Sequence, residues 1–176
     1  MCLVGEFVAA NAPDDGMLHE QQLSSRWKAP SAGLYKLNSD AAFQGMRMGI
    51  GGILRDEEGV TVVVYCSTKN GKFDVAVGEP IAMRSSLKTI MEAGYRNFIL
   101  ETDNISLFHH LKKASTPPCY FGSLVKDILT LASRCKRCDF SFVKRSGNFV
   151  AHSLAKLSFS FSEYRVWLEE YPHYYI

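Results

Sequence analysis

The sequence lacks a strong excess of charge of either sign. Its 20 lysine and arginine residues nearly balance 18 aspartate and glutamate residues, which gives a formal net charge of +2 at pH 7. A chain so close to neutral does not attract a polyanion through its overall field. If nucleic acid is the partner, a local basic patch or bound metal ions must therefore meet its phosphates.

Long apolar runs are also missing. No stretch approaches the roughly 18–20 apolar residues that a helix needs to cross a bilayer. The first residues, MCLVGEFVAANAPDDG, contain neither a basic segment nor a long apolar segment, so a secretory signal is not expected. We therefore expect an intracellular location, in the nucleus or the cytoplasm.

Cysteine is scarce, with five residues, an odd number, in a chain long enough to fold without disulfides. Reduced thiols are the expected state. Cys135 and Cys138 form one C-x-x-C motif, but no second pair of this kind completes a zinc site. Two thiols near the end of a helix are therefore favoured over a zinc centre.

The length of 176 residues and the hydrophobic content of 47% fit one domain with an ordinary core. Residues 1–26 are mostly polar and contain the turn cluster NAPDDG, which predicts a flexible leader. An ordered domain is expected over residues 27–160, followed by a C-terminal tail over residues 161–176.

Hydrophobic periodicity predicts five strands and four helices in the order βββαβααβα. The strands are expected over residues 33–43, 49–56, 60–67, 96–102 and 139–145, and the helices over residues 80–94, 105–113, 123–135 and 148–159. Pro80 suits a first helical turn, Gly94 a helix stop and Asn148 an N-cap. The pattern predicts an α/β protein in which helices cover a mixed sheet.

Three acids stand at strand or helix starts among apolar neighbours. Asp40 follows YKLN, Glu79 heads the apolar stripe of its helix, and Asp103 closes a buried strand. Ligands of open α/β sheets collect beyond the carboxyl ends of the strands, where Asp103 stands. Clustered carboxylates repel one another unless cations lie among them, and oxygen ligands suit Mg²⁺ or Mn²⁺.

Each acid also has a purely structural interpretation. Asp40 can end a strand or begin a turn, Glu79 can interact with a helix dipole, and Asp103 can be an N-cap. The spacing alone does not show that the three side chains converge, so both interpretations stay open at the level of the residues.

Five blocks of the sequence resemble a known family. They are WKAPSAGLYKLNSDAA, GIGGILRDEEG, GEPIAMRSSL, LETDN and RSGNFVAHSLAK, and they span about Trp27 to Lys156. Together they resemble the ribonuclease H type 1 domain, in its plant reverse-transcriptase-like branch. The resemblance implies a ribonuclease H-like α/β fold. Its five-stranded mixed sheet would have three antiparallel strands, then two parallel strands, with flanking helices.

The resemblance also implies a metal site. The acid of the family's K-x-N-x-D motif matches Asp40, the glutamate of its E-x-x-A-x-R motif matches Glu79, and the aspartate of its E-x-D motif matches Asp103. These three would gather around two Mg²⁺ or Mn²⁺ ions. Asp103 would then be a metal ligand at the end of the central strand.

One position departs from the family pattern. The family's fourth acid matches His152, within RSGNFVAHSLA. Neutral imidazole ligates Mn²⁺ more readily than Mg²⁺, and the site loses one negative charge. His152 can instead act as a proton shuttle, because its reference pKa lies near neutrality. A surface histidine beside Lys156 is the structural alternative.

The expected function is metal-dependent hydrolysis of the RNA strand of RNA–DNA hybrids. Asp40, Glu79, Asp103 and His152 would be the catalytic and metal-binding residues. The hybrid would be recognised through its shape and its 2′-hydroxyls. The alternative is a catalytically inactive ribonuclease H-like domain that binds nucleic acid or a protein.

Other residues are weaker candidates for contacting nucleic acid. The candidates that could stack on bases or hold a backbone are Tyr120, Phe121, Lys144 and Arg145. Aromatic residues near a helix start are more often part of a core. His109 and His110 point about 100° apart on a helix, so they are expected to be ordinary surface or edge residues.

Overall fold

The computed structural model describes residues 26–169. Residues 1–25 of the predicted leader and residues 170–176 of the predicted tail lie outside the described residues. Between residues 26 and 169, no helix combines the length and the apolar composition needed to cross a membrane.

The centre of the molecule is a mixed sheet with the strand order β5-β4-β1-β2-β3-β6. Strands β1, β2 and β3 form an antiparallel meander, and β4 and β5 continue the sheet parallel to β1. The strands are β1 Tyr35–Gln44, β2 Arg47–Arg55, β3 Thr61–Asn70, β4 Asn97–Thr102, β5 Arg137–Phe142 and β6 Arg165–Leu168. The predicted ribonuclease H-like arrangement of three antiparallel and two parallel strands is confirmed.

Over residues 26–169 the sheet has six strands rather than the five predicted. The sixth, β6, lies in the predicted tail and pairs antiparallel with β3. Its four residues are too few to show a period, so the segment RVWL carries no strand signal of its own. The strand forms because β3 offers an edge and because Trp167 packs edge-on against Phe161, with ring centroids 5.6 Å apart.

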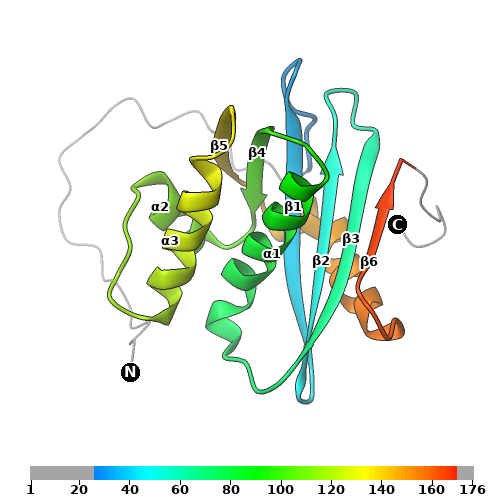
Figure 1. Ribbon diagram of the computed structural model, residues 1–176, viewed down its shortest axis with the longest axis vertical. Helices are drawn as coiled ribbons and strands as arrows, with labels where there is room; N and C mark the ends of the chain where they lie inside the picture. The colour runs from blue at the N-terminus through cyan, green and yellow to red at the C-terminus, as the bar shows by residue number, and fades with distance from the viewer. Residues whose placement is uncertain (1–25, 170–176) are drawn as a thin grey trace.

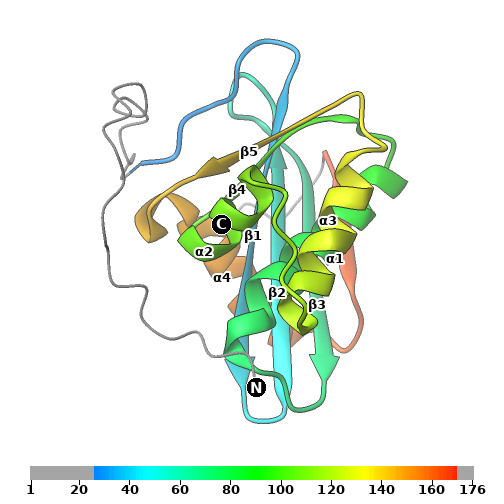
Figure 2. The same ribbon diagram turned by 90° about the vertical axis from the view of Figure 1, so that its left-hand side faces the viewer.

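Within the described part of the chain, four α-helices cover the two faces of the sheet. Their bounds are α1 Gly78–Glu92, α2 Ile105–Lys112, α3 Tyr120–Ala132 and α4 Phe149–Leu157. Figures 1 and 2 show α1 and α3 on one face and α4 on the other. The predicted stop of α1 is confirmed, because Gly94 has a φ of +100° just beyond the C-cap Ala93.

Most of the apolar core lies under α1 and α3. Leu37 and Leu54 of the sheet pack there against Met83, Leu87 and Ile90 of α1, all almost fully buried. On the opposite face the core under α4 is smaller and includes Ile53, Val64 and Leu154.

Helix α4 approaches the sheet closely because β2 carries glycines on that face. A Cβ added to Gly49 would lie 2.2 Å from the Ala155 carbonyl oxygen, and one added to Gly51 would lie 2.3 Å from the Ala155 nitrogen. Only glycine leaves room for the helix backbone at this distance. The GIGG segment therefore determines how near the residues of α4 come to strand β1.

In the C-x-x-C motif, Cys135 lies shortly after α3 and Cys138 lies in β5. Cys135 and Cys138 are free thiols, and burial raises the pKa of Cys138 to about 12. Among residues 26–169, the one cluster of potential ligands that could hold a metal ion lies elsewhere, at the end of β4.

Candidate metal centre

The first acid, Asp40, lies on a part of strand β1 that is not paired with β4. The pairing of β1 with β4 ends at Asn38 and Glu101, so β1 continues past the end of its neighbour. Asp40 is the second residue beyond that point and is only 5% exposed. Its carboxylate therefore lies beside a part of β1 that β4 no longer pairs with, at a position that solvent barely reaches.

The second acid, Glu79, comes from the first turn of α1. The residue before it, Gly78, lets the helix start close to β1, because a Cβ there would lie 3.1 Å from the Ala41 Cβ. The Ala41 amide then donates to Asp40 Oδ1 at 2.9 Å and to Glu79 Oε1 at 3.3 Å. One backbone N–H thus brings the two carboxylates together.

The third acid, Asp103, directly follows β4. Helix α2 is capped by the next residue, Asn104, whose side chain accepts a hydrogen bond from the Leu107 amide at 2.9 Å. The N-cap interpretation of Asp103 is therefore wrong, because Asn104 already fills that role. Asp103 Oδ1 instead accepts a hydrogen bond from Asn148 Nδ2 at 3.1 Å.

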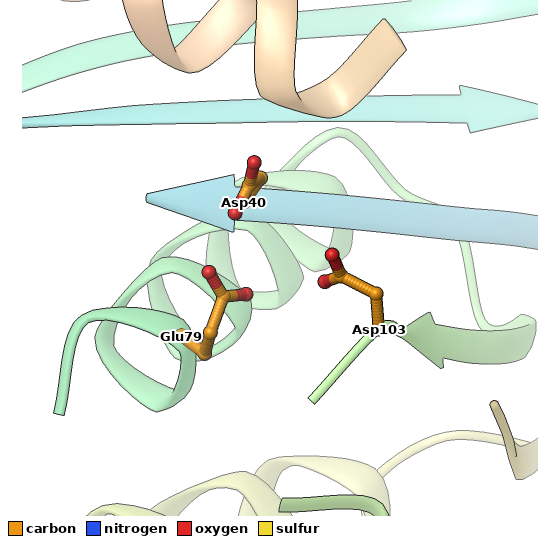
Figure 3. A group of neighbouring side chains, drawn as sticks. All are labelled: Asp40, Glu79 and Asp103. Carbon is orange, nitrogen blue, oxygen red and sulfur yellow. The ribbon is translucent and has the colours of Figure 1, made fainter. Parts of the chain in front are cut away.

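The three acids converge. One carboxylate oxygen from each of Asp40, Glu79 and Asp103 lies within 4.8 Å of the other two. Figure 3 shows the three carboxyl groups turned toward a common point, from strand β1, helix α1 and the segment after β4. The convergence that spacing alone left open is thus present in the fold.

The electrostatics of this cluster are unfavourable without a cation. Burial raises the pKa of Glu79 well above its usual value, and the neighbouring Asp40 and Asp103 raise it further. Burial and the charge of Asp40 likewise raise the pKa of Asp103. The cluster relieves this repulsion by holding protons or by binding a positive ion.

His152 lies against the cluster, as the motif match predicted. Its Nδ1 is 2.6 Å from Asp40 Oδ2, and its side chain faces the site from α4. It does not belong to the group of ligand atoms that lie within 4.8 Å of one another. The structure therefore places His152 as a partner of Asp40 at the side of the acidic cluster.

The acids open into a cleft of about 1110 Å³. Arg145 and Lys156 add positive charge to its walls, and Phe43, Ile105 and Phe159 add apolar surface. The combination of acids at the base, cations at the walls and exposed apolar groups is chemically suited to a phosphate-bearing ligand.

The weaker candidates for contacting nucleic acid divide into three groups. Arg145 lines the cleft, whereas Phe121 packs into the core and makes an edge contact with the ring of His110. Tyr120 and Lys144 are exposed but are not among the residues that line the cleft. The interpretation of Phe121 as a core residue is the one that the structure supports.

Asn148 has a part that the sequence reasoning missed. It stands at the N-cap position of α4, as predicted, but its side chain makes no capping hydrogen bond. It donates instead to the Ser39 carbonyl at 3.0 Å and to Asp103. The alternation of KLNSD places Lys36, Asn38 and Asp40 on one face of β1, but it does not identify Asn148 as their neighbour.

Several solved structures that share the fold of this chain are ribonucleases H. RNase H1 of the archaeon Halobacterium salinarum matches with a TM-score of 0.65 at 19% identity, covering 73% of this chain and 98% of that one. LC11-RNase H1 in complex with RNA/DNA hybrid matches with a TM-score of 0.63 at 15% identity, covering 72% and 96%. These likenesses show the fold.

The N-terminal RNase H domain of a Mycobacterium tuberculosis protein gives a similar match, with a TM-score of 0.63 at 14% identity over 72% of this chain and 94% of that one. No curated protein matches the sequence. The family model described as reverse transcriptase-like matches residues 38–158, a segment that contains all three acids and His152. The chain therefore belongs to the reverse transcriptase-like family, and its domain has the ribonuclease H fold.

Proposed function

We propose that the protein is a metal-dependent endonuclease that hydrolyses the RNA strand of RNA–DNA hybrids. The observation that carries this proposal is the convergence of Asp40, Glu79 and Asp103, with pKa values raised at Glu79 and Asp103. Three clustered acids, of which Asp40 is buried and Glu79 and Asp103 are half-buried, cost free energy unless a cation joins them.

The donor set fits hard divalent cations. All three groups offer carboxylate oxygens, which suit Mg²⁺ and Mn²⁺, and no sulfur ligand is among them. In phosphodiester hydrolysis, two such ions supply activation of a water and stabilisation of the leaving oxygen. Asp40, Glu79 and Asp103 would hold them at the base of the cleft.

The chain's own residues would orient the substrate and the ligands. Arg145 and Lys156 line the cleft on the α4 side and would hold phosphate oxygens. His152, hydrogen-bonded to Asp40, would keep that carboxylate in place and could carry a proton at its second ring nitrogen.

Two observations support an RNA–DNA hybrid as the substrate. LC11-RNase H1, which shares the fold, was solved with an RNA/DNA hybrid. The net charge of +2 and the small number of cleft cations favour recognition by shape over strong electrostatic capture. Metal ions bound by the acidic cluster would neutralise the phosphate charge that the lysine and arginine residues of the chain leave unbalanced.

One observation favours the alternative of a binding module without nuclease activity. His152 stands where the family has a fourth acid, and its Nδ1 already occupies Asp40 Oδ2 at 2.6 Å. A protonated His152 would neutralise Asp40 and compete with a metal ion for it. In that case the cleft would bind nucleic acid or a protein without cutting.

A hybrid-cleavage assay separates the two functions. Wild-type protein should cleave the RNA strand of a labelled hybrid when Mg²⁺ or Mn²⁺ is added, and Asp103→Asn should abolish cleavage with either ion. Asp127→Asn is the matched control, because this carboxylate pairs with Arg84 on the exposed surface of α3 and should leave cleavage unchanged. Hybrid binding without cleavage by the wild type would establish the binding module instead.

A further inference from the structure

A buried network of polar side chains lies beside the acidic cluster, on the face of the sheet that α4 covers. We call it the Asn38–Asn148 network. Its members are Trp27, Lys36, Asn38, Arg55, Glu101, Ser141 and Asn148. None of these residues is a ligand or a cleft cation in the proposed mechanism.

Every hydrogen-bonding position of the Asn38 amide is used. Its Nδ2 donates to Glu101 Oε2 at 3.0 Å and to Asn148 Oδ1 at 3.3 Å. Its Oδ1 accepts from Trp27 Nε1 at 2.9 Å and from Arg55 Nη2 at 3.0 Å. If the Asn38 amide were rotated by 180°, its NH₂ group would face the N–H donors of Trp27 and Arg55, and its oxygen would face the Glu101 carboxylate. Only one orientation of the amide therefore satisfies all four partners.

Asn148 is fixed in turn by Asn38. Because its Oδ1 accepts from Asn38, its Nδ2 must point the other way, toward the Ser39 carbonyl and Asp103 Oδ1. Both hydrogens of this Nδ2 are thus used, one on strand β1 and one on the third acid. The Asn148 side chain therefore bridges strand β1 and Asp103, with one hydrogen bond to each.

The far end of the network is a buried ion pair. Lys36 Nζ lies 3.1 Å from Glu101 Oε1, and the two residues are 7% and 4% exposed. Lys36 also donates to the Lys28 carbonyl at 2.7 Å, and Ser141 donates to Glu101 at 2.8 Å. A buried pair of this kind stabilises a fold less than apolar packing would, so its contribution here is the orientation of the amides.

We propose that Asn148 is a positioning residue for Asp103 and that Asn38, fixed by Trp27, Arg55 and Glu101, orients Asn148. The inference rests on the proposed function, since the positioned group is a ligand of the proposed metal site. Outer partners that orient ligands commonly change metal affinity by about 10–100-fold when they are removed.

The network also extends the functional unit beyond the family match. Trp27 and Lys36 precede residue 38, where that match begins. The Arg55 guanidinium lies 3.6 Å from the centre of the Trp27 ring, and a Cβ on Gly147 would lie 3.2 Å from the Trp27 nitrogen. The segment before β1 is thus held against the turn that presents Asn148.

The test is direct Mn²⁺ binding, measured by calorimetry and by the loss of the free-ion EPR signal. Asn148→Ala should raise the dissociation constant for Mn²⁺ about 10–100-fold, the range expected when an orienting partner is removed. Ile128→Val, a fully buried change in α3, is the stability control. It should lower Tm while leaving Mn²⁺ affinity within about two-fold, because distant sites act independently. Equal affinity for Asn148→Ala and the wild type would overturn the inference.

Trp27→Phe provides a milder second variant. It keeps the ring beneath Arg55 but removes the donor to Asn38, so it should fold and should weaken Mn²⁺ binding less than Asn148→Ala does. Raising Mn²⁺ should restore the activity of both variants if the defect is one of positioning. A wild type that binds no more Mn²⁺ than Asp40→Asn would overturn the metal site itself, a result distinct from equal binding by wild type and Asn148→Ala.

Discussion

The two faces of the sheet are built differently. Under α1 and α3 the sheet presents large apolar side chains such as Leu37 and Leu54, which pack on Leu87 and Ile90. Under α4 it presents glycines and a polar network, and the apolar cluster is small. The first face removes much more apolar surface from water, and that burial is the main source of folding free energy.

The two faces therefore have different roles: the α1 face contributes most of the stability, and the α4 face determines the geometry of the site. Alternation along β1 sends Leu37 to the α1 face and Asn38 and Asp40 to the α4 face. Stability and site geometry can therefore be changed independently, except where both faces meet at Asp40 and Glu79. The following experiments test that separation.

The largest expected effect is a loss of stability from the α1 face. Leu87→Ala removes a fully buried side chain and should cost about 2–5 kcal/mol in the free energy of unfolding. Denaturant unfolding measures this loss. Mn²⁺ affinity, measured on protein shown to be folded by circular dichroism, should stay at the wild-type value. A parallel loss of Mn²⁺ affinity would break the separation of the two faces.

The second prediction compares neighbouring glycines on opposite faces. Gly51→Ala places a Cβ against the backbone of α4, so the helix must move and carry His152 away from Asp40. Overpacking of this kind should cost about 1–3 kcal/mol and should also weaken Mn²⁺ binding. Thermal unfolding and calorimetry measure the two effects.

The matched control is Gly52→Ala, whose Cβ would meet the Ser86 side chain on α1. It should lower Tm but should leave Mn²⁺ affinity close to that of the wild type. If Gly52→Ala impaired metal binding as strongly as Gly51→Ala, the special role of the α4 face would be lost.

The third prediction concerns the choice of ion. Mg²⁺ depends more on carboxylate charge than Mn²⁺, which accepts nitrogen more readily. The wild type should therefore cleave hybrid faster with Mn²⁺, and His152→Asp should raise Mg²⁺-supported cleavage by about ten-fold, a change of ~1.4 kcal/mol. Cleavage rates of the wild type and of His152→Asp on a labelled hybrid, measured with each ion separately, test this preference. Equal rates for the wild type with both ions would refute the preference.

Much of the fold was predictable because its signals are local. The alternation of β1, the apolar run of β4, Pro80 and Gly94 predict elements whose bounds the structure matches within a few residues. Strand β6 was not predictable in the same way, because its four residues form a strand only against the edge of β3.

The site was predictable only through the resemblance to a family. Spacing identified the three acids but did not show that they converge, because convergence depends on where the pairing of β1 and β4 ends. The part played by Asn148 was missed, since an asparagine before a helix usually predicts a cap. Its true partner, Asp103, is 45 residues away in the sequence.

The smallest expected effect lies where the two faces meet, at Glu79. Its pKa and that of Asp103 are raised in the folded protein. The folded state thus holds more protons than the unfolded state, and stability falls as pH rises through the interval between the unfolded and folded pKa values. For carboxyl groups that interval begins near pH 4. The metal-free protein should therefore be less stable at pH 7 than at pH 5 on account of these two groups.

Glu79→Gln removes a carboxyl group whose pKa burial and neighbouring acids raise well above its usual value, and with it the repulsion toward Asp40 and Asp103. At pH 7.5 without metal, the variant should melt about 2–4 °C above the wild type, the shift that ~1 kcal/mol produces in a domain of this size. Added Mn²⁺ should raise the Tm of the wild type by mass action and leave that of Glu79→Gln nearly unchanged. Thermal scans at pH 5 and 7.5, with and without Mn²⁺, measure both effects. A variant that melts below the wild type at pH 7.5 would show that Glu79 stabilises the metal-free fold, and the acidic cluster would then need no cation to hold it together.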